Sequence, residues 1–416
     1  MEHVFILIYA VILIISGKIF KRKYGYLCNA IFLTTAIWCI FASIAAINPI
    51  GLRPPVPIVH IYSILFLLSF NICSYAIQIR KASQIQNPLD YHGNMKKVNK
   101  RIMKKVNKRI AIVEVLCLMI LAPMLLLGME AILSGNAGAY RFSVYFGSDA
   151  GFFTKTVPVA ILNSLMIMSL YLYFNNKSKG HLINSLVIVL SLSVLSSGRG
   201  SIFCFLMIYL FMSTVYSSFN IKTMKLPIYV GIAGIIFMTV SVRGGDMLNS
   251  LITYFSGSFS FLDYILANPY DYGLESYHYG MMTLSPVTEP LMYILKAIQM
   301  TSEKIPSYYL NLYVQDFVDI GMTNTVMFNN NTTALLPFIL DGGWLGVLFG
   351  GCFLAFLASK TYSYFINRSM VGGIMYLYVV NGMFMTTISY QSFISITPFL
   401  ALLVIYFCVK PCLKNK

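Results

Sequence analysis

The sequence predicts an all-α polytopic membrane protein with about eleven transmembrane helices and one large outer loop. Hydrophobic residues make up 58% of the 416 residues and charged residues only 11%, whereas a soluble domain carries roughly 25% charged residues. The mean hydropathy is +0.73. Apolar segments of about 20 residues, the length that a membrane-spanning helix needs, follow one another along the chain, and basic residues are concentrated in alternate loops between them.

Eleven apolar segments are candidate spans. The first is not a cleavable signal peptide, because its basic residues follow the apolar run instead of preceding it. The sixth and seventh are short and meet at Gly198-Arg199-Gly200. The spans are expected at about residues 3–20, 26–47, 57–79, 110–133, 153–174, 181–198, 200–219, 226–242, 334–358, 370–388 and 393–409.

Lysine and arginine residues orient these spans. Cytoplasmic loops of membrane proteins carry an excess of both residues, so the basic cluster Lys18–Lys23 after the first span places the N-terminus outside and the next loop inside. The same alternation places the basic loop 80–109 and the C-terminal tail inside. The formal net charge of +16 then reflects membrane topology, and no nucleic-acid partner is expected.

Two features of the spans and inside segments have structural explanations. Residues 95–110 contain one octapeptide twice in tandem, which a cytoplasmic loop tolerates well; binding to a lipid surface or to a partner is the alternative. The eight cysteines all lie in spans or inside segments, so neither a disulfide framework nor a metal site is expected.

The spans divide the chain into three regions: residues 1–242 with eight spans, a long outside loop at 243–333, and residues 334–416 with three spans and a basic tail. A loop of this length is improbable in a compact protein unless it is functional. Its apolar residues recur at helical spacing, so we expect amphipathic helices that lie along the outer membrane surface and cap a cavity between spans. These helices are expected at Leu251–Leu266, Glu289–Met300 and Tyr308–Ile320.

The outside loop is rich in tyrosine, most densely between Asp271 and Tyr279. Tyrosine offers an apolar ring face and a polar tip, which match the CH faces and hydroxyls of a sugar. Tyr277 and Tyr279, together with the acids Asp263 and Asp271, are therefore candidate carbohydrate-binding residues. An interfacial aromatic belt would contain the same tyrosines and is the alternative.

Four arginines lie in predicted outside segments, where basic residues are normally sparse. Arg199 is the best placed, because Gly198 and Gly200 let the backbone approach a ligand closely. The next helix is expected to begin here, so its free N–H groups would point at the same ligand. A guanidinium at a helix N-terminus suits a phosphate or pyrophosphate, whereas snorkelling or pairing with an acid is the structural alternative.

The other three outside arginines differ in their settings. Arg243 lies beside glycines at the start of the long loop, where a salt bridge to Asp246 is the alternative role. Arg141 has aromatic neighbours and is a candidate to face the same cavity. Arg53 precedes two prolines in a short turn and is expected to be structural.

A general base for a sugar hydroxyl is expected in the same outside loop. His278 is the first candidate, because histidine titrates near neutral pH. Glu275, Asp271 and Asp263 are rival candidates. A hydrogen-bonded loop histidine is the structural alternative for His278, and His60, which lies within a span, is expected to be structural.

Three short stretches carry a resemblance to a known family. The first is Leu195-Ser196-Ser197-Gly198-Arg199-Gly200, between two spans. The second is Tyr254-Phe255-Ser256-Gly257-Ser258, followed by Phe261-Leu262-Asp263. The third is Asn331-Thr332-Thr333, followed by Phe338-Ile339-Leu340-Asp341-Gly342-Gly343-Trp344-Leu345-Gly346. With one large outer loop late in the chain, they make the chain similar to the bacterial O-antigen and capsule repeat-unit polymerases of the Wzy type, which are related to the O-antigen ligases.

The resemblance implies a GT-C-like glycosyltransferase of the bacterial inner membrane, acting in O-antigen or capsule biosynthesis. Such enzymes move a growing glycan from one undecaprenyl-pyrophosphate carrier to the terminal sugar of another lipid-linked repeat unit. The implied partners are these two substrates, membrane lipids and a chain-length regulator, with no cofactor. In this reading the catalytic residues are Arg199, Arg243, His278 and Glu275, and the substrate-binding residues are Arg141, Gly198, Gly200, Asp263, Asp271, Tyr277, Tyr279 and Asp341.

Other membrane functions are compatible with parts of this pattern. An O-antigen ligase uses the same donor with a lipid A-core acceptor, and sequence alone separates it poorly from a polymerase. A lipid-linked oligosaccharide flippase or other transporter would be expected to show repeated halves and charges near the membrane midplane, which the predicted spans lack. A receptor or structural membrane protein would not need outside arginines beside glycines.

Overall fold

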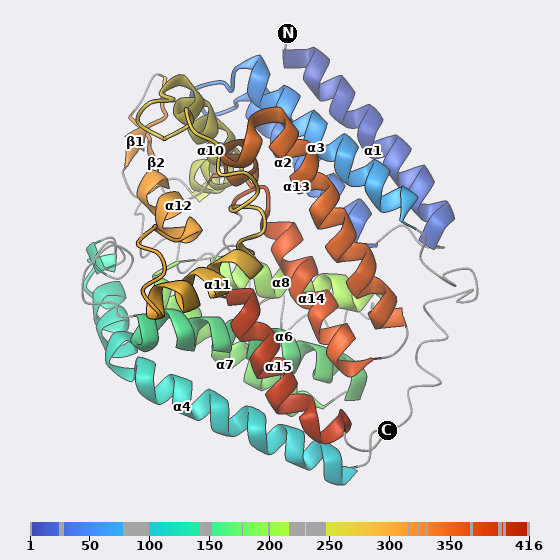
Figure 1. The fold of residues 1–416 in the computed structure, drawn as a ribbon, viewed down its shortest axis with the longest axis vertical. Coiled ribbons are helices and arrows are strands. Elements are labelled where there is room, and N and C mark those ends of the chain that lie inside the picture. The colour runs from blue at the N-terminus through green and yellow to red at the C-terminus, as the bar shows by residue number, and fades with distance from the viewer. Residues whose placement is uncertain are drawn as a thin grey trace. The chain divides into compact units, whose positions relative to one another are not determined.

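The computed structural model describes most of the chain, and the described residues are mainly helical (Figure 1). A short two-stranded hairpin accompanies the helices. The described residues are 2–24, 29–77, 100–137, 139–140, 143, 152–176, 178–198, 200–215, 229, 247–314, 317–322, 325–328, 332–366, 369–389, 393 and 397–413.

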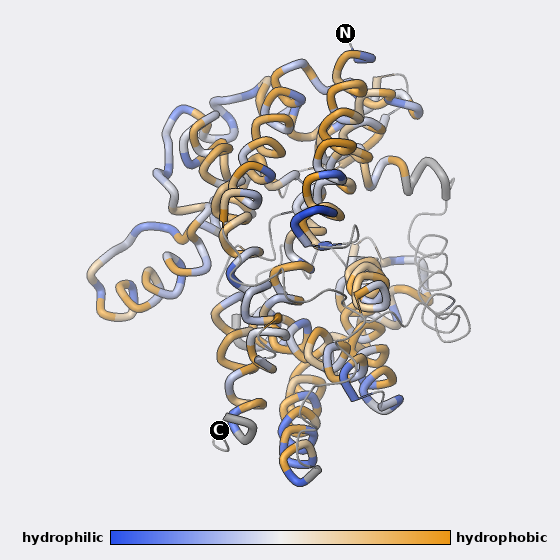
Figure 2. The backbone as a smooth tube through the Cα atoms, turned by 90° about the vertical axis from the view of Figure 1, so that its right-hand side faces the viewer, coloured by the Kyte–Doolittle hydropathy of each residue, from blue (hydrophilic) through white to orange (hydrophobic). Residues whose placement is uncertain are grey.

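Seven helices are long and apolar enough to cross a membrane, as length and composition alone define it. They are α1 (Glu2–Tyr24), α2 (Ala30–Ile47), α3 (Pro57–Ala76), α4 (Lys100–Leu133), α6 (Val157–Asn176), α7 (Lys179–Ser196) and α13 (Leu335–Ile366). Three shorter apolar helices are α8 (Gly200–Val215), α14 (Met370–Met385) and α15 (Thr397–Leu413). Figure 2 shows the apolar residues running along the helices, with polar residues gathered mainly at their ends and in the connecting segments.

These helices occupy most of the predicted spans. α4 begins earlier than expected, so the second copy of the tandem octapeptide is part of this helix and not of a loop. A short π-helix, η3 (Phe152–Thr156), precedes α6. The predicted eighth span, 226–242, lies outside the described residues apart from residue 229. The number of eleven spans and their orientation stay predictions.

Local sequence explains where several helices begin and end. The Asn29 side chain accepts a hydrogen bond from the Phe32 N–H at 2.9 Å and thereby caps the start of α2. Asn48, with φ 50°, ends this helix in the left-handed conformation that asparagine tolerates. Pro57 opens α3, at a position where a helix needs no N–H donor.

The chain forms two compact units, each assembled from separate segments of sequence. The first unit comprises Met1–Gln84, Leu248–Ser363 and Gly382–Phe399. The second comprises Ile85–Met247, Tyr364–Asn381 and Leu400–Lys416. Nearly all of the predicted long loop therefore belongs to the first unit, together with α1, α2, α3 and α13.

Helix α10 (Met247–Ala267) occupies the core of the first unit. The Phe259 ring meets Trp38 edge-on at 5.8 Å, and the Ser258 hydroxyl donates to the Thr387 carbonyl at 2.8 Å. Ser256 is buried too, and its hydroxyl is satisfied there because it donates to the Ile252 carbonyl of its own helix at 2.7 Å. The helix predicted at Leu251–Leu266 is thus confirmed, but it is packed in the core and does not lie on the surface. Its small polar residues make that burial possible.

The rest of the long loop forms two helices and the hairpin. The predicted helix at Glu289–Met300 corresponds to α11 (Ser285–Ala297), and the one at Tyr308–Ile320 to α12 (Pro306–Val314). The second prediction extends too far, because β1 (Val318–Asp319) pairs antiparallel with β2 (Met327–Phe328). The Asp319 side chain accepts hydrogen bonds from the N–H groups of Gly321 and Val326, and these bonds close the hairpin turn in place of a helix.

In the second unit, α4 packs against α6 and α7, and glycines permit the closest approaches. A Cβ atom at Gly128 of α4 would lie 2.8 Å from the Val194 carbonyl oxygen of α7. A Cβ atom at Gly373 of α14 would likewise collide with the Tyr171 ring of α6. The Tyr140 hydroxyl donates to the Met124 carbonyl at 2.7 Å and ties the segment after α4 back onto that helix.

Candidate functional site

The predicted site residues fall into three groups. Arg141, Arg199 and Arg243 lie outside the described residues. Gly198 and Gly200 belong to the second unit. The others belong to the first unit and are Asp263, Asp271, Glu275, Tyr277, His278, Tyr279 and Asp341.

In the second unit, the turn around Gly198 joins two helices closely. Ser197 ends α7 in the left-handed conformation with φ 43°, and the Gly198 N–H donates to the Ser193 carbonyl at 3.1 Å. This bond is typical of a helix C-terminus that ends in a left-handed residue. Helix α8 then begins at Gly200, where we predicted a helix start. A single residue, Arg199, separates Gly198 from this N-terminus.

In the first unit, a break in α13 organises the site. Gly342 has φ 173° and ψ 34°, and Gly343 has φ 58° and ψ −131°, so two helical halves meet here. Only glycine adopts the Gly343 conformation readily. A Cβ atom at Gly346 would collide with the Phe338 carbonyl, and one at Gly350 with the Phe338 ring. Glycines on the second half therefore let it pack closely against the first.

The break holds the segment from Tyr277 to Thr283. The His278 N–H donates to the Leu340 carbonyl at 2.8 Å, and the Tyr279 N–H donates to the Asp341 carbonyl at 3.1 Å. Both carbonyls lie immediately before the break at Gly342 and Gly343. The segment from Tyr277 to Thr283 is thus attached where the α13 backbone departs from helical geometry.

The buried Asp341 carboxylate strengthens this attachment. Its Oδ1 accepts from the Met282 N–H at 2.9 Å, and its Oδ2 accepts from the Thr283 N–H at 2.6 Å. Two oxygens of one carboxyl group thus hold two successive backbone N–H groups. Both oxygens therefore have backbone donors, and Asp341 positions the segment that contains Met282 and Thr283. The substrate contact that we predicted for Asp341 stays a prediction.

The side chain of His278 has different surroundings from its backbone. Its ring packs on Tyr309 with 5.2 Å between ring centroids. Nε2 is buried and has no hydrogen-bond partner among the described residues. Burial lowers the pKa of His278, and the nearby Asp341 charge opposes this shift only in part. Burial therefore favours the neutral form of the ring.

Two exposed tyrosines flank this histidine. Tyr277 and Tyr279 meet edge-on at 6.5 Å between ring centroids. Tyr279 has φ 49°, a left-handed conformation that is rare for a bulky residue, and its ring is almost fully exposed. The Tyr277 hydroxyl lies next to Gly343, where a Cβ atom would be 3.2 Å away. Two aromatic faces are thus presented beside the helix break.

The predicted acids Asp271 and Glu275 are both exposed on the turns that precede these tyrosines. Their carboxylates can reach a ligand that approaches from solvent. Within the described ranges, no three His, Cys, Asp or Glu side chains gather as a metal site would require.

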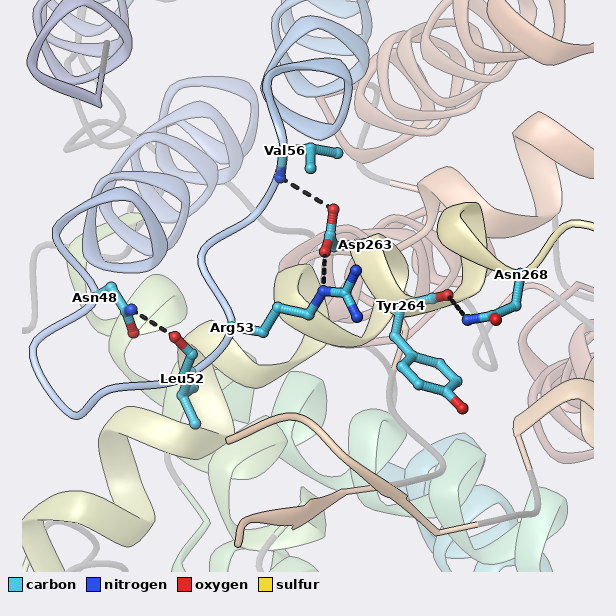
Figure 3. A network of polar contacts seen from close by, with 7 residues as sticks. All are labelled: Asn48, Leu52, Arg53, Val56, Asp263, Tyr264 and Asn268. Atoms are coloured by element: carbon cyan, nitrogen blue, oxygen red, sulfur yellow. Dashed lines mark hydrogen bonds and ion pairs between the residues drawn. The ribbon is translucent and has the colours of Figure 1, made fainter. Parts of the chain in front are cut away.

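Asp263 has a different environment (Figure 3). Its Oδ2 lies 2.7 Å from Arg53 Nε, and its Oδ1 accepts a hydrogen bond from the Val56 N–H at 3.0 Å. The carboxylate is buried, and Arg53 remains 41% exposed. The pair joins α10 to the turn before α3, which supports the structural role expected for Arg53. It leaves Asp263 little freedom to act as a base or to bind a sugar.

Sequence reasoning missed the attachments that shape this site. Nothing in the sequence showed that Asp341 would receive Met282 and Thr283, or that Arg53 would meet Asp263 across 210 residues. The Gly342-Gly343 pair next to Asp341, inside an apolar run, was the available signal of a helix break.

The sequence matches no protein-family model, and neither curated proteins nor solved structures provide a match.

Proposed function

We propose that this protein is an oligosaccharide repeat-unit polymerase that acts on undecaprenyl-pyrophosphate-linked glycans at the outer face of a bacterial inner membrane. The observation that carries the proposal is His278, whose buried Nε2 lacks a hydrogen-bond partner among the described residues while its backbone is fixed to a broken apolar helix. The exposed Tyr277 and Tyr279 beside it are suited to sugar rings.

In the proposed reaction, His278 acts as the general base. Nε2 accepts the proton of the acceptor sugar hydroxyl, and the resulting oxygen nucleophile attacks the anomeric carbon of the donor glycan. The bond between that carbon and the pyrophosphate oxygen breaks, and its electron pair leaves on undecaprenyl pyrophosphate. Glu275, exposed three residues before His278, is the rival base.

Arg199 and Arg243 are proposed to stabilise the leaving pyrophosphate. Arg199 lies between Gly198 and the N-terminus of α8, where free N–H groups favour an anion. Preorganised donors of this kind stabilise charge that develops in the transition state, and the loss of one costs about 2.7–4 kcal/mol. Positive side chains would perform this task without a metal.

The glycan chains are proposed to bind along the loop residues that precede α11. Tyr277 and Tyr279 would stack on sugar faces, and Asp271 would accept bonds from sugar hydroxyls. Asp341 would act indirectly, because its carboxylate fixes the segment that carries His278. Arg141 is a further candidate for the donor phosphate.

Deletion and complementation in the source bacterium test this proposal. The surface glycan would be separated by length on a gel, with the wild type, Arg199→Ala, Arg243→Ala and His278→Gln as complementing alleles. We expect the deletion strain and the three variants to lose the ladder and keep a single repeat unit. His3→Gln, which changes an exposed histidine far from this segment in sequence, is the matched control and should restore the ladder.

The same gel separates the alternatives. Loss of even the single-repeat band would indicate a ligase or a flippase, because a strain that lacks either protein attaches no repeat unit to the core. An unchanged glycan in the deletion strain would contradict the proposal. Variants that reach the membrane at wild-type levels and restore a full ladder would remove the proposed residues from the mechanism.

A further inference from the structure

Helix α11 has the opposite polarity to a helix on the surface of a soluble protein. Its inward side carries Ser285 and Glu289, both fully buried, and Met292. Its outward side carries a row of aliphatic residues that are between 53% and 69% exposed. The row consists of Val287, Leu291 and Ile294 of the helix and of Ile298, its C-cap residue.

The spacing of this row is that of one helical face. Positions 287, 291, 294 and 298 are separated by four, three and four residues, so their side chains line up along the helix. A water-facing helix would place Glu289 outward and the aliphatic row inward. The arrangement is stable only if something apolar covers the row.

Lipid is the occupant that the surroundings favour. Helix α1 of the same unit, which is long and apolar enough to cross a membrane, exposes aliphatic residues to a similar degree, among them Leu7 and Ile14. The outward row of α11 therefore resembles the faces that this chain presents to a bilayer. Because α11 has 13 residues, it is about 20 Å long and cannot cross an apolar layer of about 30 Å.

The C-terminal end of the row matches a membrane surface in charge and in side-chain type. Lys296 lies in the last turn of α11. Lys304 follows, with its Nζ 4.8 Å from the centre of the Tyr308 ring. Basic residues beside an apolar face bind anionic lipid headgroups, and tyrosine favours the membrane–water boundary.

We propose that α11 lies flat in the membrane–water boundary, with Val287, Leu291, Ile294 and Ile298 inserted among lipid acyl chains. This helix begins two residues after Thr283, whose N–H binds Asp341. A lipid-bound α11 thereby ties the His278 segment to the membrane surface. The lipid contact is independent of the glycosyl transfer proposed above.

Spin-label accessibility tests this contact in the full chain reconstituted in lipid nanodiscs that contain anionic phospholipid. Single cysteines would be placed at Leu291 and Ile294 in a background without the native cysteines. Glu303→Cys, at an exposed polar position, is the water-facing control. Met292→Cys, on the buried side of α11, is the protein-facing control.

We expect labels at Leu291 and Ile294 to be several-fold more accessible to oxygen, which concentrates in lipid, than to a water-soluble nickel complex. The label at Glu303 should show the reverse, and the label at Met292 should be poorly accessible to both. Nickel access at Leu291 and Ile294 equal to that at Glu303 would overturn the proposal. Low access to both reagents would also overturn it, because a second copy or another part of the chain would then cover the row.

Discussion

The backbone and the ring of His278 face different environments. The backbone N–H is bound to the Leu340 carbonyl, whereas the buried Nε2 has no partner among the described residues. An unpaired buried polar atom costs free energy unless a ligand or water satisfies it. A ligand that supplied a hydrogen-bond partner to Nε2 would therefore gain this free energy on binding.

Acid should destabilise the wild type through this histidine. Burial lowers the pKa of His278 in the folded protein, so below about pH 6.5 the unfolded chain binds a proton that the folded chain resists. Stability at this residue is present above that pH and is lost as the pH falls. We expect the melting temperature of the wild type to drop more between pH 7.5 and 5.5 than that of His278→Gln. Equal drops would contradict a lowered pKa.

The Arg53–Asp263 pair should stabilise the fold and not the chemistry. Arg53→Ala would leave the buried Asp263 carboxylate with the Val56 N–H as its remaining partner. Breaking a fully buried pair costs about 3–5 kcal/mol, and the partial exposure of Arg53 reduces our expectation to about 2 kcal/mol. Thermal unfolding in nanodiscs measures this loss. The double variant Arg53→Ala/Asp263→Asn should recover part of it, and no recovery would contradict the pairing.

Among the elements, the break in α13 coincides with the attachment of the segment 277–283. The carbonyls of Leu340 and Asp341, just before Gly342 and Gly343, accept two of its backbone N–H groups. The Asp341 carboxylate accepts two more.

Two neighbouring glycines provide a matched test of this break. Gly343→Ala should cost about 1–3 kcal/mol, because φ 58° with ψ −131° strains any L side chain and a Cβ atom would press on the Tyr277 hydroxyl. Gly342→Ala should be tolerated, because its φ is extended and a Cβ atom there meets nothing within 4 Å. Thermal unfolding and the glycan ladder measure both variants. A tolerated Gly343→Ala would show that the break is not required.

The packing of α3 on α13 can be tested by oxidation. The Sγ atoms of Cys73 and Cys352, one on each helix, lie 2.6 Å apart. Mild oxidation of membranes that contain the protein should link them in a disulfide, detectable as a joined peptide by mass spectrometry. Cys73→Ser should abolish the product. Failure of the wild type to form it, with both thiols accessible to labelling, would contradict this helix pairing.

The positions of the helices could be predicted from sequence, but which of their faces are buried could not. Apolar runs and helical spacing are local signals, and they located α1–α3 as well as α10 and α11. Burial is not a local property. The pattern of α10 suits a surface helix equally well, and only contact with Trp38 and Thr387 places it in a core. The inverted polarity of α11 is likewise visible only once its buried side is known.

At the scale of the whole molecule, each of the two compact units contains helices apolar enough to cross a membrane. Residues 248–333, predicted as a long outer loop, contribute α10 to the core of the first unit, so this segment is part of the fold and not an appendage. The roles that residue type suggests for His278, Tyr277 and Tyr279 stay predictions. The pairing of Asp263 with Arg53 joins residues 210 apart, and no neighbouring sequence indicates it.

Glycosyl transfer between lipid-linked repeat units can be measured with purified protein. The deletion strain supplies the substrate, because it should accumulate single repeat units on undecaprenyl pyrophosphate. Wild-type protein in nanodiscs should convert them to carriers that bear two or more repeats and release free undecaprenyl pyrophosphate. His278→Gln should slow this conversion about 10²–10⁴-fold, and His3→Gln should not. Single repeat units that the wild type leaves unchanged would contradict the proposed polymerase activity. Full activity of His278→Gln would contradict the proposed role of His278 as the general base.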